Sequence, residues 1–371
     1  MKRAVLWAWV CALPLLGGCS AMGYYWQSVS GHVRLMQASR PIDQWLQSDA
    51  TPEALKERLR LAGRIRAFAS QQLHLPDNPS YLSYANLDRP AAVWNVVAAP
   101  EWSLQPKQWC FPVAGCVSYK GYYDEAAAAQ EAQQLAAQGL ETAVQPVPAY
   151  STLGWLNWAG GDPLLSTFIG YPEGELARLI FHELAHQVVY VAGDTAFNES
   201  FATAVERLGV GLWLEQASDA TRSQYALYDG RRRQWRDLAM QLRRDLMALY
   251  KQAPTTGRIE PSLLGAKRAL MKDFARQYVL LRESWGGWSG YDRWAARLNN
   301  ATLAALAEYE DLTPAFEALY QRQASWPAFY KEVRRLAQLP MNERHQQLRQ
   351  LAPLVAMGSA SVPQPKNSKA K

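Results

Sequence analysis

The sequence predicts an α+β fold that is mostly helical and contains a small β-sheet portion. Apolar residues recur at helical spacing in several long segments, and three short segments rich in β-branched and aromatic residues predict strands. No internal repeat is visible. We expect a single domain at residues 19–355, with an α/β part at 19–160 and a helical part at 161–355, because about 350 residues can bury one large core.

In the first part, helices and strands alternate. Leucine, isoleucine and alanine repeat at helical intervals in Pro52–Leu73, which predicts an amphipathic helix. Asp124–Gln138 is rich in alanine and is followed by Gly139, which predicts a second helix. The predicted strands are bounded by Pro or Gly and lie at Ala92–Val97, Val113–Tyr119 and Glu141–Val147.

Helices dominate the second part. They are predicted at Ser223–Lys251, Pro261–Glu283 and Gly290–Asn299, with shorter helices as far as Ala352. Arginines between Arg231 and Arg244 alternate with Trp and Leu, which favours a solvated basic face over a contact with an anionic membrane. Ser, Pro, Lys and Asn dominate residues 358–371, so this segment is predicted to be a disordered tail.

The N-terminus predicts export. Two basic residues precede an apolar stretch from Ala4 to Leu15 that is too short to span a bilayer, and small residues lead from there to Cys19. The Leu-Gly-Gly-Cys ending resembles a bacterial lipobox, which implies that residues 1–18 are a signal peptide and that the Cys19 thiol carries lipid. Serine after this cysteine implies sorting to the outer membrane. We therefore expect a lipid-anchored protein of the bacterial envelope, on the outer membrane and facing the periplasm.

Two cysteines, Cys110 and Cys116, remain once Cys11 leaves with the signal and Cys19 carries lipid. They bracket the turn-forming sequence Phe-Pro-Val-Ala-Gly. In an oxidising compartment this pair predicts a disulfide, and no further Cys or His lies near enough in sequence to complete a metal site.

The net charge bears on whether the protein binds nucleic acid. The formal net charge of +6 falls to +4 when the two basic residues of the signal are lost, so the mature chain is only mildly basic. This charge gives no support for a nucleic-acid partner, and the sequence identifies no protein partner.

A His-Glu-Leu-Ala-His motif is the strongest functional signal. His182 and His186 lie one helical turn apart on one face, as two ligands of a single zinc ion require. Glu183 projects beside that face, where it can take a proton from water. The flanking residues Leu179–Phe181 and Val188–Val191 are apolar, so ionisable residues in such a helix need a partner such as a metal.

A third ligand is expected from the next helix, which Asp194 and Thr195 begin after Gly193 ends the motif helix. Glu199 and Glu206 follow His186 after twelve and nineteen intervening residues and are two helical turns apart. Both could face the site. The residue that does not bind the metal could orient a ligand histidine or could be a solvated helix residue.

These motifs resemble those of the gluzincins, the thermolysin-like and aminopeptidase-type zinc peptidases, which pair HExxH with a Glu in an Asn-Glu-x-Phe-Ala segment. The segment Asn198–Ala202 matches that pattern and implies Glu199 as the ligand. The longer spacing usual in those families would instead place it nearer Glu206. With the lipobox and the late segments Arg297–Asn300 and Pro314–Phe316, the mature chain is similar to the zinc aminopeptidase lipoprotein family of proteobacteria. The resemblance implies a zincin-like metallopeptidase acting on peptides.

The expected chemistry is hydrolysis by zinc-activated water, with Glu183 as general base. Gluzincins add a Tyr or His that stabilises the oxyanion; Tyr278 and Tyr291 are candidates, although tyrosines in helical cores are commoner. An aminopeptidase also needs an acidic group for the substrate ammonium. The segment that gluzincin aminopeptidases use for it is missing here, and Asp162, Glu173 and Glu206 are possible substitutes.

Three hypotheses about the function remain open. Aminopeptidase activity is the first expectation. An envelope endopeptidase would also cut blocked peptides, and a non-enzymatic zinc lipoprotein would have no use for a base at Glu183. The segment Tyr150–Trp155 could be an edge strand that binds substrate, or Trp155 and Trp158 could fill the core.

Overall fold

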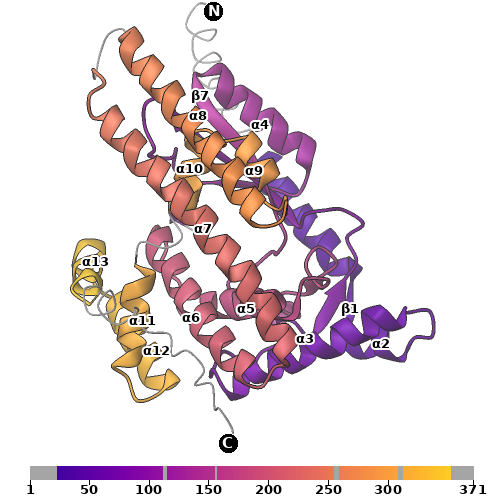
Figure 1. Ribbon diagram of the computed structural model, residues 1–371. Coiled ribbons are helices and arrows are strands. Elements are labelled where there is room, and N and C mark those ends of the chain that lie inside the picture. The colour runs from indigo at the N-terminus through magenta and orange to yellow at the C-terminus, as the bar shows by residue number, and fades with distance from the viewer. Residues whose placement is uncertain (1–22, 112–114, 155–156, 255–258, 308–311, 352–371) are drawn as a thin grey trace, which may run out of the picture.

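The computed structural model describes residues 23–111, 115–154, 157–254, 259–307 and 312–351 (Figure 1). The fold is α+β and mostly helical, which confirms the predicted class. The expected signal peptide, Cys19 and the tail at 358–371 lie outside the described residues. None of the helices described is long and apolar enough to cross a membrane.

A small sheet joins the beginning of the chain to the segment before the motif. Residues 23–38 are helical and lead into β1 (Ser39–Pro41), α2 (Ile42–Gln47) and α3 (Glu53–Gln71). Strand β1 pairs antiparallel with β2 (Ser83–Ala85), and β2 pairs parallel with β8 (Leu164–Leu165). These strands are too short to show an alternating pattern, so the sequence analysis missed them.

A second sheet has helices on both faces. Its order is β6 (Lys120–Tyr122), β3 (Val93–Pro100) and β7 (Leu140–Val147), all antiparallel. Alternate residues of β3 face opposite sides: Trp94, Val96 and Ala98 pack under α4 (Glu125–Ala137), whereas Val97 and Ala99 pack under α10 (Asn300–Ala307). This explains why β3 is apolar except at Asn95. The helix predicted at 124–138 is confirmed, with Asp124 as its N-cap.

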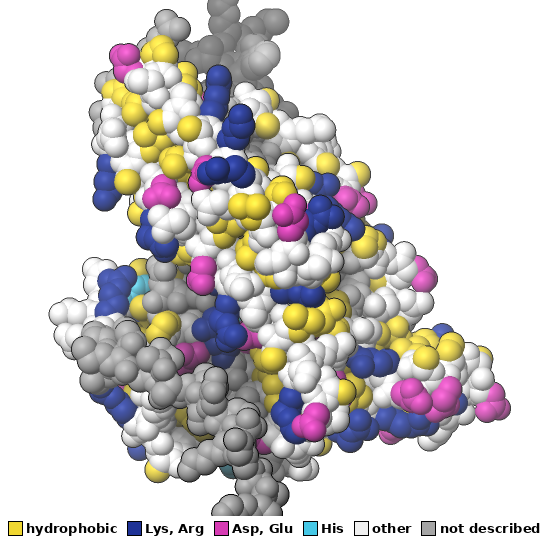
Figure 2. Space-filling view, in the orientation of Figure 1, with side chains coloured by type: hydrophobic (Ala, Val, Ile, Leu, Met, Phe, Trp, Pro, Cys, Tyr) yellow, Lys and Arg dark blue, Asp and Glu magenta, His cyan; other side chains and the backbone are white. Residues whose placement is uncertain are grey.

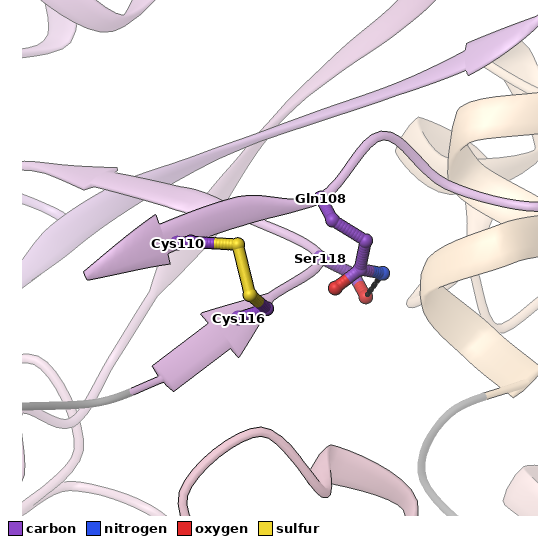
Figure 3. Close-up of a disulfide and its surroundings, with 4 residues drawn as sticks. All are labelled: Gln108, Cys110, Cys116 and Ser118. Atoms are coloured by element: carbon purple, nitrogen blue, oxygen red, sulfur yellow. Dashed lines mark hydrogen bonds between the residues drawn. A yellow bond between two sulfur atoms is a disulfide. The ribbon is translucent and has the colours of Figure 1, made fainter. Parts of the chain in front are cut away.

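A disulfide closes the hairpin beside this sheet. Strands β4 (Trp109–Phe111) and β5 (Gly115–Val117) pair antiparallel, and Cys110 and Cys116 face each other across them with an S–S distance of 2.00 Å (Figure 3). The Gln108 amide donates to the Ser118 hydroxyl at the open end. The strand expected at Val113–Tyr119 is confirmed in its middle part by β5, which ends at Val117, and residues 113 and 114 lie outside the described residues.

The main core surrounds α5 (Glu173–His186) and α6 (Thr195–Glu215). It contains side chains from Leu35 to Leu348, contributed by α3, α5, α6, α11 (Thr313–Gln321) and α12 (Trp326–Ala337). Helix α5 ends at His186, so the expectation that Val188–Val191 continue it and that Gly193 ends it is wrong. Gly193 instead occupies the left-handed region immediately before α6.

Two long helices form a hairpin, and the first of them packs against α5 (Figure 1). They are α7 (Asp219–Tyr250) and α8 (Pro261–Ser284), followed by the short α9 (Asp292–Ala296). The predicted helix at Gly290–Asn299 therefore corresponds only to α9, and a new helix, α10, begins at Asn300.

The basic face predicted for α7 is only partly solvated. Arg233 is exposed, but Arg232 binds Glu175 of α5 and Arg231 lies over the Trp288 ring. On the face shown in Figure 2, basic and acidic side chains are interspersed.

The last helix that the structure describes contacts the start of α6. Helix α13 (Met341–Arg349) places His345 Nε2 2.9 Å and Arg344 Nε 3.2 Å from a carboxylate oxygen of Asp194. Asp194 is buried and also caps α6 by accepting the Phe197 amide hydrogen. The helix start predicted at Asp194 is thus confirmed, and this contact holds the first turn of α6 in place.

Candidate metal centre

The local structure fixes the two helices that carry the motif. Helices α5 and α6 pack against each other and are joined by a short loop. The Asn198 side chain accepts the Val191 amide hydrogen and donates to the Val191 carbonyl, each at 2.8 Å. Because Asn198 precedes Glu199, this pair of bonds fixes where α6 presents Glu199 to α5.

Three expected ligands meet between these helices. The Nε2 atoms of His182 and His186 face each other at 3.2 Å. Glu199 lies beside both, with Oε2 3.2 Å from His182 Nε2 and Oε1 3.7 Å from His186 Nε2. One ligand atom from each residue lies within 4.8 Å of the others, so the group could hold a metal ion.

Burial and charge act differently on the members of this group, which could hold a cation. Glu199 Oε2 and His186 Nδ1 are buried and make no hydrogen bond of ordinary geometry, although Oε2 lies 3.2 Å from His182 Nε2. Burial lowers the pKa of His186 to about 4, so its Nε2 lone pair is free to bind a metal at neutral pH. Burial opposes ionisation of Glu199, but the two histidines outweigh it and keep its pKa below the ordinary value.

Glu206 supports the site from the opposite side of His182. Its Oε2 lies 2.8 Å from His182 Nδ1, and its Oε1 accepts a bond of 2.8 Å from Arg178. Burial would raise the pKa of Glu206, but Arg178 and His182 hold it at about 2. Glu206 is therefore an ionised carboxylate that fixes the His182 ring, and it is not a solvated helix residue.

The charges continue outward from Glu206. Arg178 also binds Glu175 at 3.2 Å, and Glu175 accepts two bonds from Arg232 of α7, at 2.8 and 3.0 Å. Opposite charges thus alternate from His182 through Glu206, Arg178 and Glu175 to Arg232. This series links the metal-ligand helix to the hairpin that covers it.

Glu183 lies near Asp162 and Ser151, on which its pKa depends. Burial raises the pKa of Glu183 to about 7, Glu199 and Asp162 add to this effect, and His182 and a hydrogen bond with Ser151 oppose it. Asp162 is buried and accepts the Thr152 amide hydrogen on both oxygens, at 3.0 and 3.1 Å. A carboxyl group whose pKa lies near neutral pH can both accept and return a proton.

Tyr81 completes the surroundings of Glu183. Its side chain is buried and its hydroxyl has no hydrogen-bond partner. Burial raises the pKa of Tyr81 well above its ordinary value, and the nearby Glu183 and Asp162 add to the rise. The phenol is therefore a neutral donor close to the expected base.

Several expected contributors lie elsewhere. Tyr278 donates to Asp292 at 2.6 Å and Tyr291 stacks on Trp235, so both tyrosines belong to the packing around α8 and α9. Glu173 accepts a bond from the Trp213 indole. Of the three carboxylates considered for substrate ammonium, Asp162 is the one near Glu183.

The expected edge strand before the motif is also absent. Residues 150–154 form a turn, with Leu153 and Gly154 at positive φ. Trp158 is exposed and does not fill the core, and Trp155 lies outside the described residues. In this conformation the Ser151 side chain forms a hydrogen bond with Glu183.

Sequence reasoning did not single out Ser151, Tyr81 or Arg178. The position of Arg178, one turn before His182 on the same helix face, could have indicated that its side chain lies near the site. Ser151 and Tyr81 had none, because both reach the site through contacts distant in sequence. Tyr190 was missed as well; burial and Glu199 raise its pKa, which places it near the ligand group.

Comparison with known proteins identifies a family for the chain. No curated protein and no solved structure matches the chain. A family model described as Putative aminopeptidase matches residues 23–348, which include the helices that carry the three metal-binding side chains and Glu183. The match extends over most of the sequence, and the chain therefore belongs to the Putative aminopeptidase family.

Proposed function

We propose that this protein is a zinc-dependent aminopeptidase of the bacterial envelope. The observation that carries the proposal is the meeting of His182, His186 and Glu199 beside a partly buried Glu183 whose pKa is raised to about 7. Family membership supports peptidase activity on peptide substrates. Zinc dependence, the role of Glu183 and the anchor are the finer parts of the proposal.

The residues present fit zinc. Two imidazoles and one carboxylate are a common protein donor set for catalytic zinc and leave a fourth position open. A cation between the three side chains would be bound by the buried Glu199 oxygen, which makes no hydrogen bond of ordinary geometry, and by the two facing Nε2 atoms. When bound, zinc supplies a Lewis acid that polarises a carbonyl and lowers the pKa of water.

Side chains of this protein carry out the proton transfers and position the reacting groups. Glu183 takes the proton of the attacking water and passes it to the leaving nitrogen of the peptide. Ser151 holds the Glu183 carboxylate through its hydrogen bond, and Glu206 holds His182 with the proton on Nδ1, which leaves Nε2 for the metal. Tyr81, a neutral phenol near Glu183, is the donor best placed among the tyrosines considered to stabilise an oxyanion.

Asp162 supports the aminopeptidase form of the proposal. Removal of an N-terminal residue requires a negative group near the base that attracts the substrate ammonium. Asp162 lies close enough to Glu183 to raise its pKa, so a free ammonium at the reacting end of a peptide would be attracted to the same place. An endopeptidase has no requirement for such a charge.

The anchor is proposed from the sequence. Cys19 and the preceding residues resemble a lipobox, and we propose that lipid on Cys19 holds the protein on the outer membrane, facing the periplasm. The Cys110–Cys116 disulfide suits such an oxidising compartment.

Release of N-terminal amino acids from an unblocked peptide library tests the function. The zinc-loaded protein is compared with chelator-treated protein, with chelator-treated protein given zinc again, and with Glu183→Gln. We expect release by the zinc-loaded and zinc-restored samples only, and no cleavage of the same peptides after N-acetylation. Cleavage of acetylated peptides would favour an endopeptidase. Failure of fully zinc-loaded protein to cleave either library would overturn the enzymatic proposal in favour of a zinc-containing binding lipoprotein.

A further inference from the structure

The helix at residues 23–38 packs on the protein through one face. Tyr24 stacks on Phe111, and Gln27 accepts the Tyr123 amide hydrogen at 3.1 Å. A Cβ at Gly31 would overlap the Tyr123 ring, so the helix approaches closely there, and Leu35 is buried in the main core. Residues 24, 27, 31 and 35 follow helical spacing and define this inner face.

The opposite side of the helix is also apolar. Trp26 is 73% exposed, Val29 59%, Tyr25 46% and Val33 44%. With about 100° between successive residues, these four side chains lie within an arc of about 100° and form one stripe, the outer stripe. Polar residues on this helix lie mainly beside the stripe, at Ser30, Arg34 and Gln37. An exposed stripe of this length on an already docked helix needs a partner.

The composition of the outer stripe fits a lipid surface. Trp and Tyr concentrate at membrane interfaces because their rings are apolar and their N–H or O–H groups remain near water. The valines extend the stripe with aliphatic surface that would enter the acyl boundary. No acidic residue lies on this helix, so nothing on it repels an anionic headgroup.

The position of the stripe points to the same partner. Only three residues separate Cys19 from the first described residue, Gly23, and four Cα steps span at most roughly 14 Å. Lipid on Cys19 would therefore keep the start of the helix next to the bilayer.

The stripe also reaches the loop that serves the candidate site. Met36 lies on the same side of the helix, and a Cβ at Gly160 would be 3.7 Å from its methyl group. Two residues earlier, Trp158 is 85% exposed. Ser151 and Asp162, which both affect the pKa of Glu183, flank these two residues in the sequence. A membrane contact along the stripe would therefore border the segment that shapes the site.

We propose that the outer stripe, Tyr25, Trp26, Val29 and Val33, lies on the surface of the lipid bilayer and sets the orientation of the protein there. The inference rests on the proposed lipid anchor at Cys19. The acyl chains supply attachment, and the stripe fixes which side of the protein faces the lipid.

Nitroxide labels on two exposed side chains test this contact. Val29→Cys places a label on the stripe, and Leu227→Cys places one on α7, where the native side chain is 52% exposed. The full chain is expressed with its leader, so that Cys19 is lipidated and the other two mature cysteines are in the disulfide. The protein is placed in vesicles of phosphatidylethanolamine with a minority of phosphatidylglycerol. Collision of each label with oxygen, which concentrates in lipid, and with a water-soluble nickel chelate is then measured.

We expect the Val29 label to collide with nickel several-fold less and with oxygen several-fold more than the Leu227 label. Equal access of both labels to nickel would overturn the proposal. A Val29 label shielded from both reagents would also overturn it, because a second copy or another protein would then cover the stripe. The mass of the intact protein reports lipid on Cys19 separately. A missing lipid therefore counts against the anchor, and an accessible Val29 label on lipidated protein counts against the stripe alone.

Discussion

Replacement of Glu206 by Gln should weaken zinc binding without removing it. In the structure Glu206 is buried, and each of its oxygens contacts a donor at 2.8 Å, one on His182 and one on Arg178. Glutamine has the same shape but only one oxygen. Either the His182 ring or Arg178 would then face an amide NH₂ group, which cannot accept. Loss of such a carboxylate typically costs 10- to 100-fold in metal affinity.

The expected change is therefore a rise of about 10- to 100-fold in the zinc Kd, or about 1.4–2.7 kcal/mol. Competition with a chromophoric chelator at fixed pH measures it. Glu215→Gln on the exposed end of the same helix is the matched control and should leave the Kd unchanged. Glu199→Gln should remove stoichiometric zinc, because Glu199 contributes a ligand atom.

Two results would refute this reasoning. An unchanged Kd in Glu206→Gln would mean that the contact with His182 does not orient the ligand. A greater loss of zinc in Glu206→Gln than in Glu199→Gln would exchange their roles and make Glu206 the ligand, as the longer spacing of related peptidases implies.

Three further predictions concern the base, the metal and the anchor. Glu183→Gln should keep zinc content and Tm but lower kcat by about 100- to 10,000-fold, since Gln cannot accept the proton; an equal rate with zinc bound would exclude Glu183 as base. Chelation should lower Tm in wild type and Glu183→Gln alike, because a ligand at a thousand times its Kd stabilises the folded state by about 4 kcal/mol; a Tm unaffected by chelator would speak against the site. Cys19→Ser should abolish labelling by a fatty-acid analogue, and continued labelling would place the lipid elsewhere.

The sequence could predict the parts of the site that depend on local geometry. His182, Glu183 and His186 lie within one helical turn, so the helix alone determines their relation. Asp194 is identified by its position before an apolar helix, and it caps that helix. Long elements with a clear period, such as α3 and α8, were predicted for the same reason.

The residues around Glu183 could not be predicted, because they meet through contacts distant in sequence. The Tyr81 amide donates to the Asp162 carbonyl at 2.7 Å, and the Asp162 amide donates to the Ser80 hydroxyl at 3.1 Å. Tyr81 itself has a φ of 66°, an uncommon conformation for a bulky residue that no sequence period reveals. The strands that align these segments have only two or three residues each, below the length at which alternation is readable.

The series of charges behind His182 explains why the centre is built from three helices. A buried carboxylate at Glu206 is stable only with a cation beside it, and Arg178 supplies that cation from α5. Arg178 also binds Glu175, and Glu175 binds Arg232 of α7. The two carboxylates are the more enclosed members of the series, since the side chains of Glu206 and Glu175 are 7% and 13% exposed, whereas those of Arg178 and Arg232 are 30% and 23% exposed. Removing either arginine would leave a largely buried carboxylate without one of its partners, so the packing of α7 against α5 also supports the candidate metal centre.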